Sequence, residues 1–386
     1  MKKKFGLHEP YFVGNEKKYL LSCIKDNWVS TSGKFLRLFE KEICKKTKAK
    51  FAVPVLNGTI GLHLSLILSK VNTNDEVLVP TITFAATVNS IIYLKAEPIF
   101  MDVDENFNID EKKTIEFIKK KTCLRNGETI NLKTKKKVKA IMIVHTFGNP
   151  ANFENLYLLC KKRNIKIIED AAESLGSVYK KGKFKNCHTG TIGDFGVFSF
   201  NGNKIITAGN GGILLTKNKN NYNKANYLIT QSKDDNIRFI HNNVGYNYKL
   251  SNLSAALGLA QVEQLESFLK KKKEIRNLYK NYLRNSKNIE LIDTPKYSKN
   301  NYWLNLIRIK TKKSILKVIS ELKKYNIDTR PIWQPNHLQL PFRKFNRFNL
   351  KNYKTNIKDV LCIPSSASLK KKDIKKISNI IKKICK

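Results

Sequence analysis

Residues 198–204 read FSFNGNK, a short apolar strand pattern that runs into an Asn- and Gly-rich turn and ends on a lysine. Upstream, another apolar run ends at the acidic pair Glu169-Asp170. A lysine amine can form a Schiff base with a carbonyl cofactor, and an aspartate can keep the ring nitrogen of that cofactor protonated. Lys204 and Asp170 together therefore indicate a pyridoxal phosphate (PLP) site.

The chain around these two residues alternates short apolar runs with amphipathic stretches from about residue 50 to 215. This alternation is typical of βαβ units, so we predict an α/β fold with a mainly parallel sheet. The Lys-rich stretch 119–137 interrupts the rhythm and contains the turn signal Asn126-Gly127, which predicts a surface excursion. Strands are predicted over 51–56, 76–80, 98–103, 138–144, 165–169, 196–200 and 212–216.

Beyond Ser251 the pattern changes, and at 386 residues the chain exceeds one ordinary core. We predict two domains, a large PLP-binding α/β domain over 1–252 and a small α+β domain over 253–386. Helical spacing predicts one long helix over 253–282 that bridges them. The last helix could lie on a membrane surface, but its isoleucine stripe continues the preceding pattern and favours packing on the small domain. Further elements are predicted as strands over 303–309 and 360–363 and a helix over 315–325.

The charge balance is strongly basic, with 73 Lys and Arg against 31 Asp and Glu and a net charge of +42. Such a charge could mark nucleic-acid or anionic-membrane binding, or a solvated basic surface. The lysine runs flank helical patterns and no DNA- or RNA-binding motif is present, so we favour the solvated surface, whose field would attract an anionic substrate. We expect neither a nucleic-acid nor a membrane partner.

The seven cysteines have no C-x-x-C pair, which predicts neither a disulfide framework nor a zinc site, and we expect no metal. No apolar run approaches the ~18 residues of a membrane span, and the start lacks a signal-peptide pattern. These observations predict a reduced, cytoplasmic protein.

Several residues near the predicted strand ends could hold the cofactor. Gly58 and Thr59 follow Asn57 at a strand-to-helix turn, where backbone N–H groups bind phosphate, although the same sequence makes a routine helix start. Ser199 could give a hydroxyl to that phosphate or be an ordinary turn serine. Phe84 could stack on the pyridine ring or belong to the core.

Two further residues have a chemical and a structural interpretation. Glu173 lies three positions after Asp170, so both side chains can point the same way on a helical turn. Because an acid near the PLP 3′-oxygen is electrostatically unfavourable, we expect Glu173 to be protonated or hydrogen-bonded elsewhere. His145 ends another predicted strand and is a candidate cavity wall, a proton relay or a structural histidine.

In this order, the motifs resemble the DegT/DnrJ/StrS family of PLP-dependent nucleotide-sugar aminotransferases, from about Glu9 to Ile384. The resemblance implies a fold type I transferase with a seven-stranded large domain, and a homodimer with shared active sites. It assigns Lys204 in SFNGNK as the Schiff-base lysine and Asp170 in EDAAES as the pyridinium partner. By the same matching, the phosphate is held by Ser199, Gly58 and Thr59 and, from the neighbouring subunit, Asn247 in GYNYK, while Phe84 in TFAAT stacks on the cofactor.

Finer features, including HTFGNP, EDAAESLGS and GYNYKLSN, are similar to the LegC-type branch and to UDP-N-acetylbacillosamine transaminases. That branch implies amino transfer from L-glutamate to C4 of a UDP-linked 4-keto-6-deoxy-N-acetylhexosamine, for a legionaminic acid or bacillosamine-type surface glycan. Three positions depart from the family, since Lys249 replaces a usual Arg, and Ala208 and Asn210 alter the turn after the lysine.

Other functions are compatible with the same motifs. The acceptor could be another nucleotide-linked keto sugar, of the GDP-perosamine type or with a 3-keto group, or the chain could be a non-catalytic PLP-binding regulator. A sugar 3-dehydratase of this fold has His in place of the lysine, so Lys204 argues against that activity.

Overall fold

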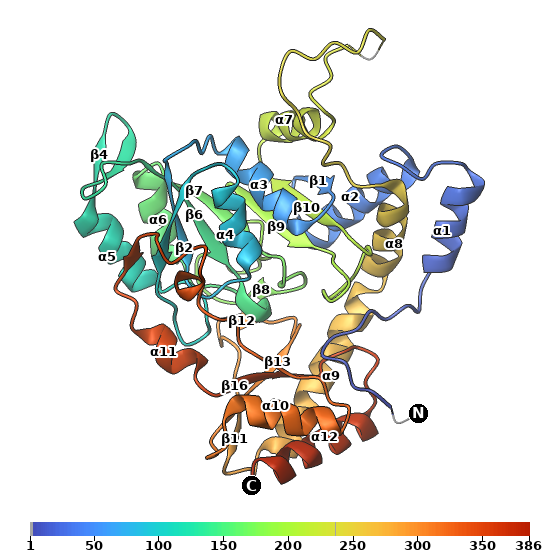
Figure 1. The fold of residues 1–386 in the computed structure, drawn as a ribbon. Helices are drawn as coiled ribbons and strands as arrows, with labels where there is room; N and C mark the ends of the chain where they lie inside the picture. The colour runs from blue at the N-terminus through green and yellow to red at the C-terminus, as the bar shows by residue number, and fades with distance from the viewer. Residues whose placement is uncertain (1–2, 236) are drawn as a thin grey trace.

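The computed structural model describes residues 3–235 and 237–386. Within these residues, eight strands form one large sheet in the order β1-β10-β9-β7-β6-β2-β3-β15 (Figure 1). The run from β9 to β15 is parallel, and β10 is antiparallel to both of its neighbours. The bounds are β1 Phe51–Val55, β2 Glu76–Pro80, β3 Glu97–Met101, β6 Val138–Val144, β7 Lys166–Asp170, β9 Phe195–Ser199, β10 Gly212–Thr216 and β15 Arg347–Phe348. The predicted α/β class and the seven predicted strands are confirmed, and the two-residue β15 is an addition.

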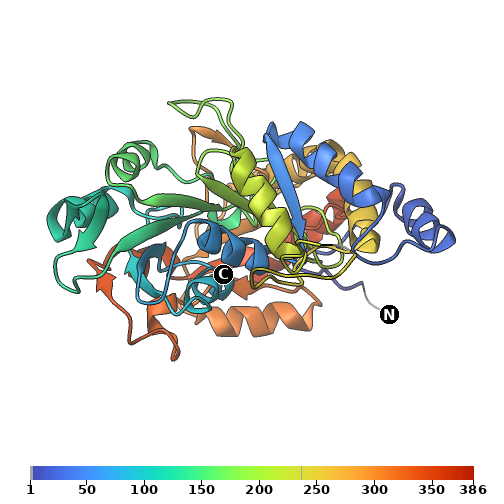
Figure 2. The same ribbon diagram turned by 90° about the horizontal axis from the view of Figure 1, so that it is seen from above.

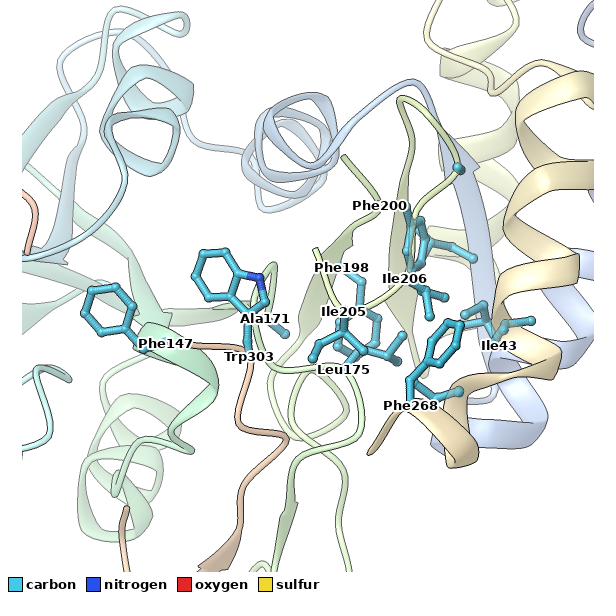
Figure 3. Packing of buried hydrophobic residues seen from close by; sticks show 14 of the residues in the cluster. Ile43, Phe147, Ala171, Leu175, Phe198, Phe200, Ile205, Ile206, Phe268 and Trp303 are labelled. Atoms are coloured by element: carbon cyan, nitrogen blue, oxygen red, sulfur yellow. The ribbon is translucent and has the colours of Figure 1, made fainter. Parts of the chain in front are cut away.

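Helices cover both faces of this sheet, because its central strands bury side chains on both sides (Figure 2). On one face, Val77 and Val79 of β2 share a core with α3 (Gly58–Leu68), α4 (Ala85–Ile92) and α7 (Lys219–Ile229). On the other face, Leu78 joins the core under α5 (Glu111–Lys121) and α6 (Glu154–Lys162). That second face continues into a cluster with α2 (Lys34–Thr47), where Phe198, Phe200 and Ile206 pack near Ile43 (Figure 3).

The C-terminal part builds a smaller four-stranded sheet, β11-β13-β16-β14. Its apolar face packs on α9 (Leu265–Leu283), α10 (Ile315–Lys324) and α12 (Lys371–Ile384). Ile374, Ile377 and Ile381 of α12 are fully buried there, which confirms that the last helix packs on this unit. The strands are β11 Ile289–Leu291, β13 Asn305–Ile309, β14 Arg330–Pro331 and β16 Val360–Ile363.

The predicted single helix over 253–282 is wrong in one respect. Two helices, α8 (Asn252–Glu263) and α9, meet at Gln264, whose φ of -91° and ψ of 0° interrupt the helical path. Helix α8 packs against α1 (Glu16–Lys25) and α2, whereas α9 runs on to the small sheet (Figure 1). The domain boundary between residues 252 and 253 stays a prediction.

From β14 the chain returns to the large sheet before it reaches β16, and we call residues 330–353, which begin with β14, the strap. It contains the 3₁₀ turn Asn336–Leu338, places β15 beside β3, and leads into α11 (Asn352–Ile357). Asn336 donates to the backbone oxygen of Thr83 at 2.7 Å, just before α4. The strap therefore links the small unit to the edge of the large sheet.

The Lys-rich excursion is a hairpin of β4 (Thr122–Arg125) and β5 (Glu128–Asn131) that turns at Asn126 and Gly127, as predicted. A second small sheet pairs β8 (Val178–Tyr179) with β12 (Ser298–Lys299). None of the helices in the described part of the chain combines the length and apolar composition that crossing a bilayer requires.

Candidate active site

One large cavity, of ≈ 1020 Å³, lies where β6 and β7 end and the N-termini of α3 and α4 begin. Ligands of open α/β sheets gather at this carboxyl edge of the strands. Residues of the small unit, among them Trp303, Arg330 and Trp333, close the opposite side. The cavity lining includes seven of the predicted site residues, namely Gly58, Thr59, Phe84, Asp170, Glu173, Ser199 and Lys204.

Lys204 lies on the turn between β9 and β10, as expected from residues 198–204. Its Nζ is 3.3 Å from Glu173 Oε1 and 4.5 Å from the ring centre of Trp303. The side chain is only 13% exposed, so the amine reaches solvent mainly through the cavity. A buried lysine that faces a cavity is suited to react with a bound carbonyl compound.

Asp170 ends β7 and lies buried in the cavity wall. Thr87 Oγ1 donates a 2.6 Å hydrogen bond to its Oδ2, and the backbone N–H of Ala172 donates to its Oδ1 at 3.2 Å. These two hydrogen bonds fix the orientation of the carboxylate. A carboxyl group held at this depth is placed to pair with a protonated ring nitrogen.

Glu173 is buried between the lysine turn and the 3₁₀ turn at Thr146–Gly148. Burial raises its pKa to about 7, although the Lys204 ammonium and the Phe147 N–H both act in the opposite direction. The Phe147 N–H donates to Oε2 at 2.8 Å, and Phe147 has a strained φ of 55°. The carboxyl is thus held by protein groups, one of the two states expected from the sequence.

The other end of the cavity has the features of a phosphate site. Asn57 caps α3 by accepting the Ile60 N–H at 3.0 Å, which directs the helix N-terminus and its dipole toward the cavity. Gly58 and Ser199 touch there, since a Cβ on Gly58 would lie 2.9 Å from Ser199 Cβ. The missing side chain keeps backbone and hydroxyl donors within reach of one small anion.

Phe84 and His145 are two further lining residues for which the sequence left alternatives open. Phe84 is 58% exposed and lies 6.1 Å, between ring centres, from Trp333, so it lines the cavity and is not a core residue. His145 Nδ1 accepts the Ala151 N–H, so the other ring nitrogen carries the hydrogen donated to Glu169 at 2.9 Å. His145 lines the cavity wall, as one of its interpretations expected, and because both of its ring nitrogens are engaged a structural role is favoured over a proton relay.

Asn247 is exposed and pairs with Thr230 outside the cavity lining of a single chain. Of the three departures, Asn210 lines the cavity and Ala208 is buried, its N–H donating to Phe200 at 2.9 Å. Lys249 pairs with Val55 at the end of β1.

Several lining residues could not be assigned from the sequence. Thr87 lies within TFAAT, three positions after Phe84, and that helical spacing is a usable signal. Trp303, Arg330 and Trp333 carry no local signal, because the small unit brings them to the cavity only through the tertiary fold.

The fold and this cavity define the class of PLP-dependent transferases with an α/β large sheet. Residues 11–382 match the DegT/DnrJ/EryC1/StrS aminotransferase family, and the chain belongs to that family. It is an aminotransferase, and its cofactor is PLP.

Two relatives and one solved structure illustrate the range of the family. GDP-perosamine synthase of Escherichia coli O157:H7 is 37% identical over 87% of this chain and 86% of its own length. The UDP-4-amino-4,6-dideoxy-N-acetyl-beta-L-altrosamine transaminase of Campylobacter jejuni is 31% identical over 67% of this chain and 64% of its own. Helicobacter pylori PseC superposes with a TM-score of 0.87 over 99% of both chains at 23% identity, which shows a shared fold.

Proposed function

We propose that the protein transfers an amino group from L-glutamate to C4 of a nucleotide-linked 4-keto-6-deoxy sugar. The observation that carries this proposal is the placement of the Lys204 amine and the Asp170 carboxylate on the walls of one cavity of ≈ 1020 Å³. An amine for the aldehyde and an acid for the ring nitrogen are the two groups that PLP chemistry requires.

The residues present fit PLP. The N-terminus of α3, with Gly58, Thr59 and the Ser199 hydroxyl, would hold the phosphate, and Asp170 would pair with the ring nitrogen. Phe84 would cover one ring face. When bound, PLP supplies an electron-accepting ring conjugated to a reactive carbonyl carbon.

Three residues of the cavity would then have defined chemical roles. Lys204 would hold the cofactor through its amine and, when that amine is free, would move a proton as general acid and base. Asp170 keeps a negative charge beside the ring nitrogen, supported by Thr87. Glu173 accepts a hydrogen bond from Lys204 and can take the proton that the ammonium must lose before it acts as a base.

The acceptor sugar has two leading candidates. The first is a UDP-linked 4-keto-6-deoxy-N-acetylhexosamine of the legionaminic acid or bacillosamine type, supported by the sequence motifs and by the Campylobacter relative. The second is the keto precursor of GDP-perosamine, supported by the higher identity and coverage of the Escherichia coli relative. Both place the amino group on C4, so the reaction at the cavity is the same.

We also propose that the enzyme is a homodimer in which Asn247 of each subunit reaches the cofactor phosphate of the other. The loop near residues 237–244 projects beyond α7 and leaves large apolar side chains in solvent (Figure 1). Ile237 is 89%, Val244 85% and Phe239 65% exposed. Contact with a second copy would cover such a patch.

We also propose that the protein works in the cytoplasm, a reducing compartment, and its free thiols support this proposal.

The test begins with purified protein and PLP. We expect a visible absorbance band that borohydride fixes at Lys204, and conversion to the pyridoxamine form when glutamate is added. Lys204→Ala should abolish both results. A band that persists in this variant would contradict the assignment, and a band without glutamate turnover would favour a regulator.

The acceptor is then identified by offering the glutamate-treated enzyme UDP- and GDP-linked 4-keto sugars and a 3-keto sugar. Mass spectrometry and NMR of the product report the nucleotide and the aminated carbon. Amination at C3 alone would contradict the proposal.

A further inference from the structure

Trp303 connects the small unit to the turn that carries Lys204. It is 3% exposed and precedes β13, and its Nε1–H donates a 2.6 Å hydrogen bond to the backbone oxygen of Asn203. The same indole ring lies 4.5 Å below the Lys204 Nζ. Figure 3 shows the ring between Phe147 and the residues around Ala171. One side chain therefore contacts both the peptide before Lys204 and the reactive amine.

Trp303 is itself held from behind by Lys272 of α9. Lys272 is 1% exposed, and its Nζ donates to the backbone oxygen of Trp303 at 2.7 Å and to that of Ser365. Burial lowers the pKa of Lys272 well below its ordinary value. A deeply buried amine bound to two carbonyls therefore ties three segments of the small unit together, one of which carries the cavity-lining Trp303.

Asn301 extends this support to the partner of the lysine. Its Oδ1 accepts the Trp303 N–H at 2.9 Å, and its Nδ2 donates to the backbone oxygen of Glu173 at 2.8 Å. Trp303 and Asn301 thus contact the two residues of the Lys204–Glu173 pair. The pair is therefore contacted by a segment about 100 residues away in the chain.

Within the turn, the Lys204 N–H donates to the Asn201 backbone oxygen at 2.9 Å and the Gly202 N–H donates to Asn201 Oδ1 at 2.8 Å, but neither bond holds the Lys204 side chain. Asn201 is exposed, and a Cβ on Gly202 would meet no atom within 4 Å. A lysine side chain has four rotatable carbon–carbon bonds, so an unsupported amine would sample many positions. A hydrogen bond to the preceding peptide and an aromatic face beneath the ammonium restrict both the backbone and the amine.

We propose that Trp303, anchored by Lys272, is a positioning residue that orients the Lys204 amine toward the PLP aldehyde. The inference rests on the proposed function. In the step concerned, the neutral amine nitrogen attacks the aldehyde carbon and a C=N bond forms. The C=O bond breaks, and the oxygen leaves as water with the two amine protons.

The test compares W303F, which keeps a ring but loses the N–H donor, with K272M and with the control W28F at an exposed tryptophan. Apoprotein is mixed with PLP, and the bond to Lys204 is followed by absorbance and by borohydride trapping. We expect W303F and K272M to slow its formation about tenfold, the equivalent of one lost hydrogen bond. W28F should match the wild type.

Two further measurements separate positioning from general stability. In apoprotein, amide hydrogen exchange of residues 201–206 should accelerate in W303F and stay unchanged in W28F. In a K204A background, W303F should leave the Kd for PLP within about twofold, because Trp303 would act only through the missing amine.

The outcomes are distinct. Unchanged bond formation in W303F, or an equal loss of PLP affinity with and without Lys204, would overturn the inference. If W303F does not fold, K272M carries the same test, since it removes the anchor and leaves the ring. If the wild type itself forms no bond at Lys204, the proposed function fails first.

Discussion

Thr87 Oγ1 lies 2.6 Å from Asp170 Oδ2, so the first helical turn of α4 fixes the carboxylate that ends β7. The Thr83 hydroxyl joins this contact, with its Oγ1 2.7 Å from Thr87 Oγ1. Both threonines are buried. The two hydroxyls therefore form a short hydrogen-bonded chain that ends on the Asp170 carboxylate.

Thr87→Val removes this hydrogen bond at nearly constant volume. We expect kcat to fall about tenfold, because a hydrogen bond to a charged group contributes about 1.5–3 kcal/mol and the acid would lose its fixed orientation. Asp170→Asn should cost more, since it removes the charge itself while PLP stays bound through its phosphate. Steady-state kinetics with glutamate measure both variants.

A matched control is Ser90→Ala. Ser90 Oγ donates to the Thr87 backbone oxygen at 2.8 Å and is fully buried, so a comparable hydroxyl is lost one turn further along. Equal losses in kcat for the two variants would mean that the helix, and not the Asp170 contact, matters.

Glu173 should make the stability of the apoprotein depend on pH. Its folded pKa of about 7 lies above the ordinary value of 4.5, so the folded state binds more protons in between. Stability from this group is complete below pH 4.5 and is lost as the pH rises through 7. This loss amounts to about 2–3 kcal/mol of the free energy of unfolding. Glu173→Gln stays neutral at every pH and should therefore not show it.

Urea unfolding of the wild type and Glu173→Gln at pH 5 and pH 8 measures the difference. Relative to pH 5, the free energy of unfolding of Glu173→Gln should rise against that of the wild type at pH 8. A gap independent of pH would show that the carboxyl titrates at its ordinary value.

The phosphate end of the cavity gives a steric prediction. Gly58→Ala would place a methyl group 2.9 Å from Ser199 Cβ, so either the helix start or the serine must shift. We expect PLP affinity to fall about tenfold or more, since the phosphate donors would lose their alignment. Equilibrium dialysis of the apoprotein against PLP measures it.

Gly202→Ala serves as the comparison, because a Cβ there meets no atom within 4 Å and its φ is not in the left-handed region. Its PLP affinity should stay within about twofold of the wild type. A similar loss in both variants would trace the effect to backbone entropy and not to the Gly58–Ser199 contact.

The sequence was most informative about the site residues that follow predicted strands. Lys204 and Asp170 follow apolar runs whose period predicts strands, and a parallel sheet brings such ends to one edge. The break between α8 and α9 at Gln264 could not be predicted from the sequence, because the helical spacing of apolar residues continues across it. The sequence also could not predict that Trp303 and residues of the strap line the cavity, since long-range packing alone brings them there.

Asp102 should hold the strap to the large sheet. It is fully buried after β3 and accepts the N–H groups of Lys351, Asn352 and Tyr353 at 2.8, 2.7 and 3.1 Å, besides the Lys113 ammonium at 2.5 Å. Burial alone would raise the pKa of Asp102, but these donors outweigh it and lower the pKa below its ordinary value. The ionised form therefore stabilises the fold.

Asp102→Asn should lower the free energy of unfolding by about 2–3 kcal/mol at pH 7, through loss of charge-assisted hydrogen bonds. Because a depressed pKa stabilises above the unfolded value of 3.8 and fails as the pH falls through the folded value, the gap to the wild type should close in acid. Lys113→Met, which leaves the three backbone donors in place, should cost less than Asp102→Asn. Urea unfolding at pH 7 and pH 3 measures all three proteins, and faster amide exchange of residues 347–353 in Asp102→Asn would locate the effect in the strap. Equal costs for the two variants would assign the stabilisation to the Lys113 ion pair alone.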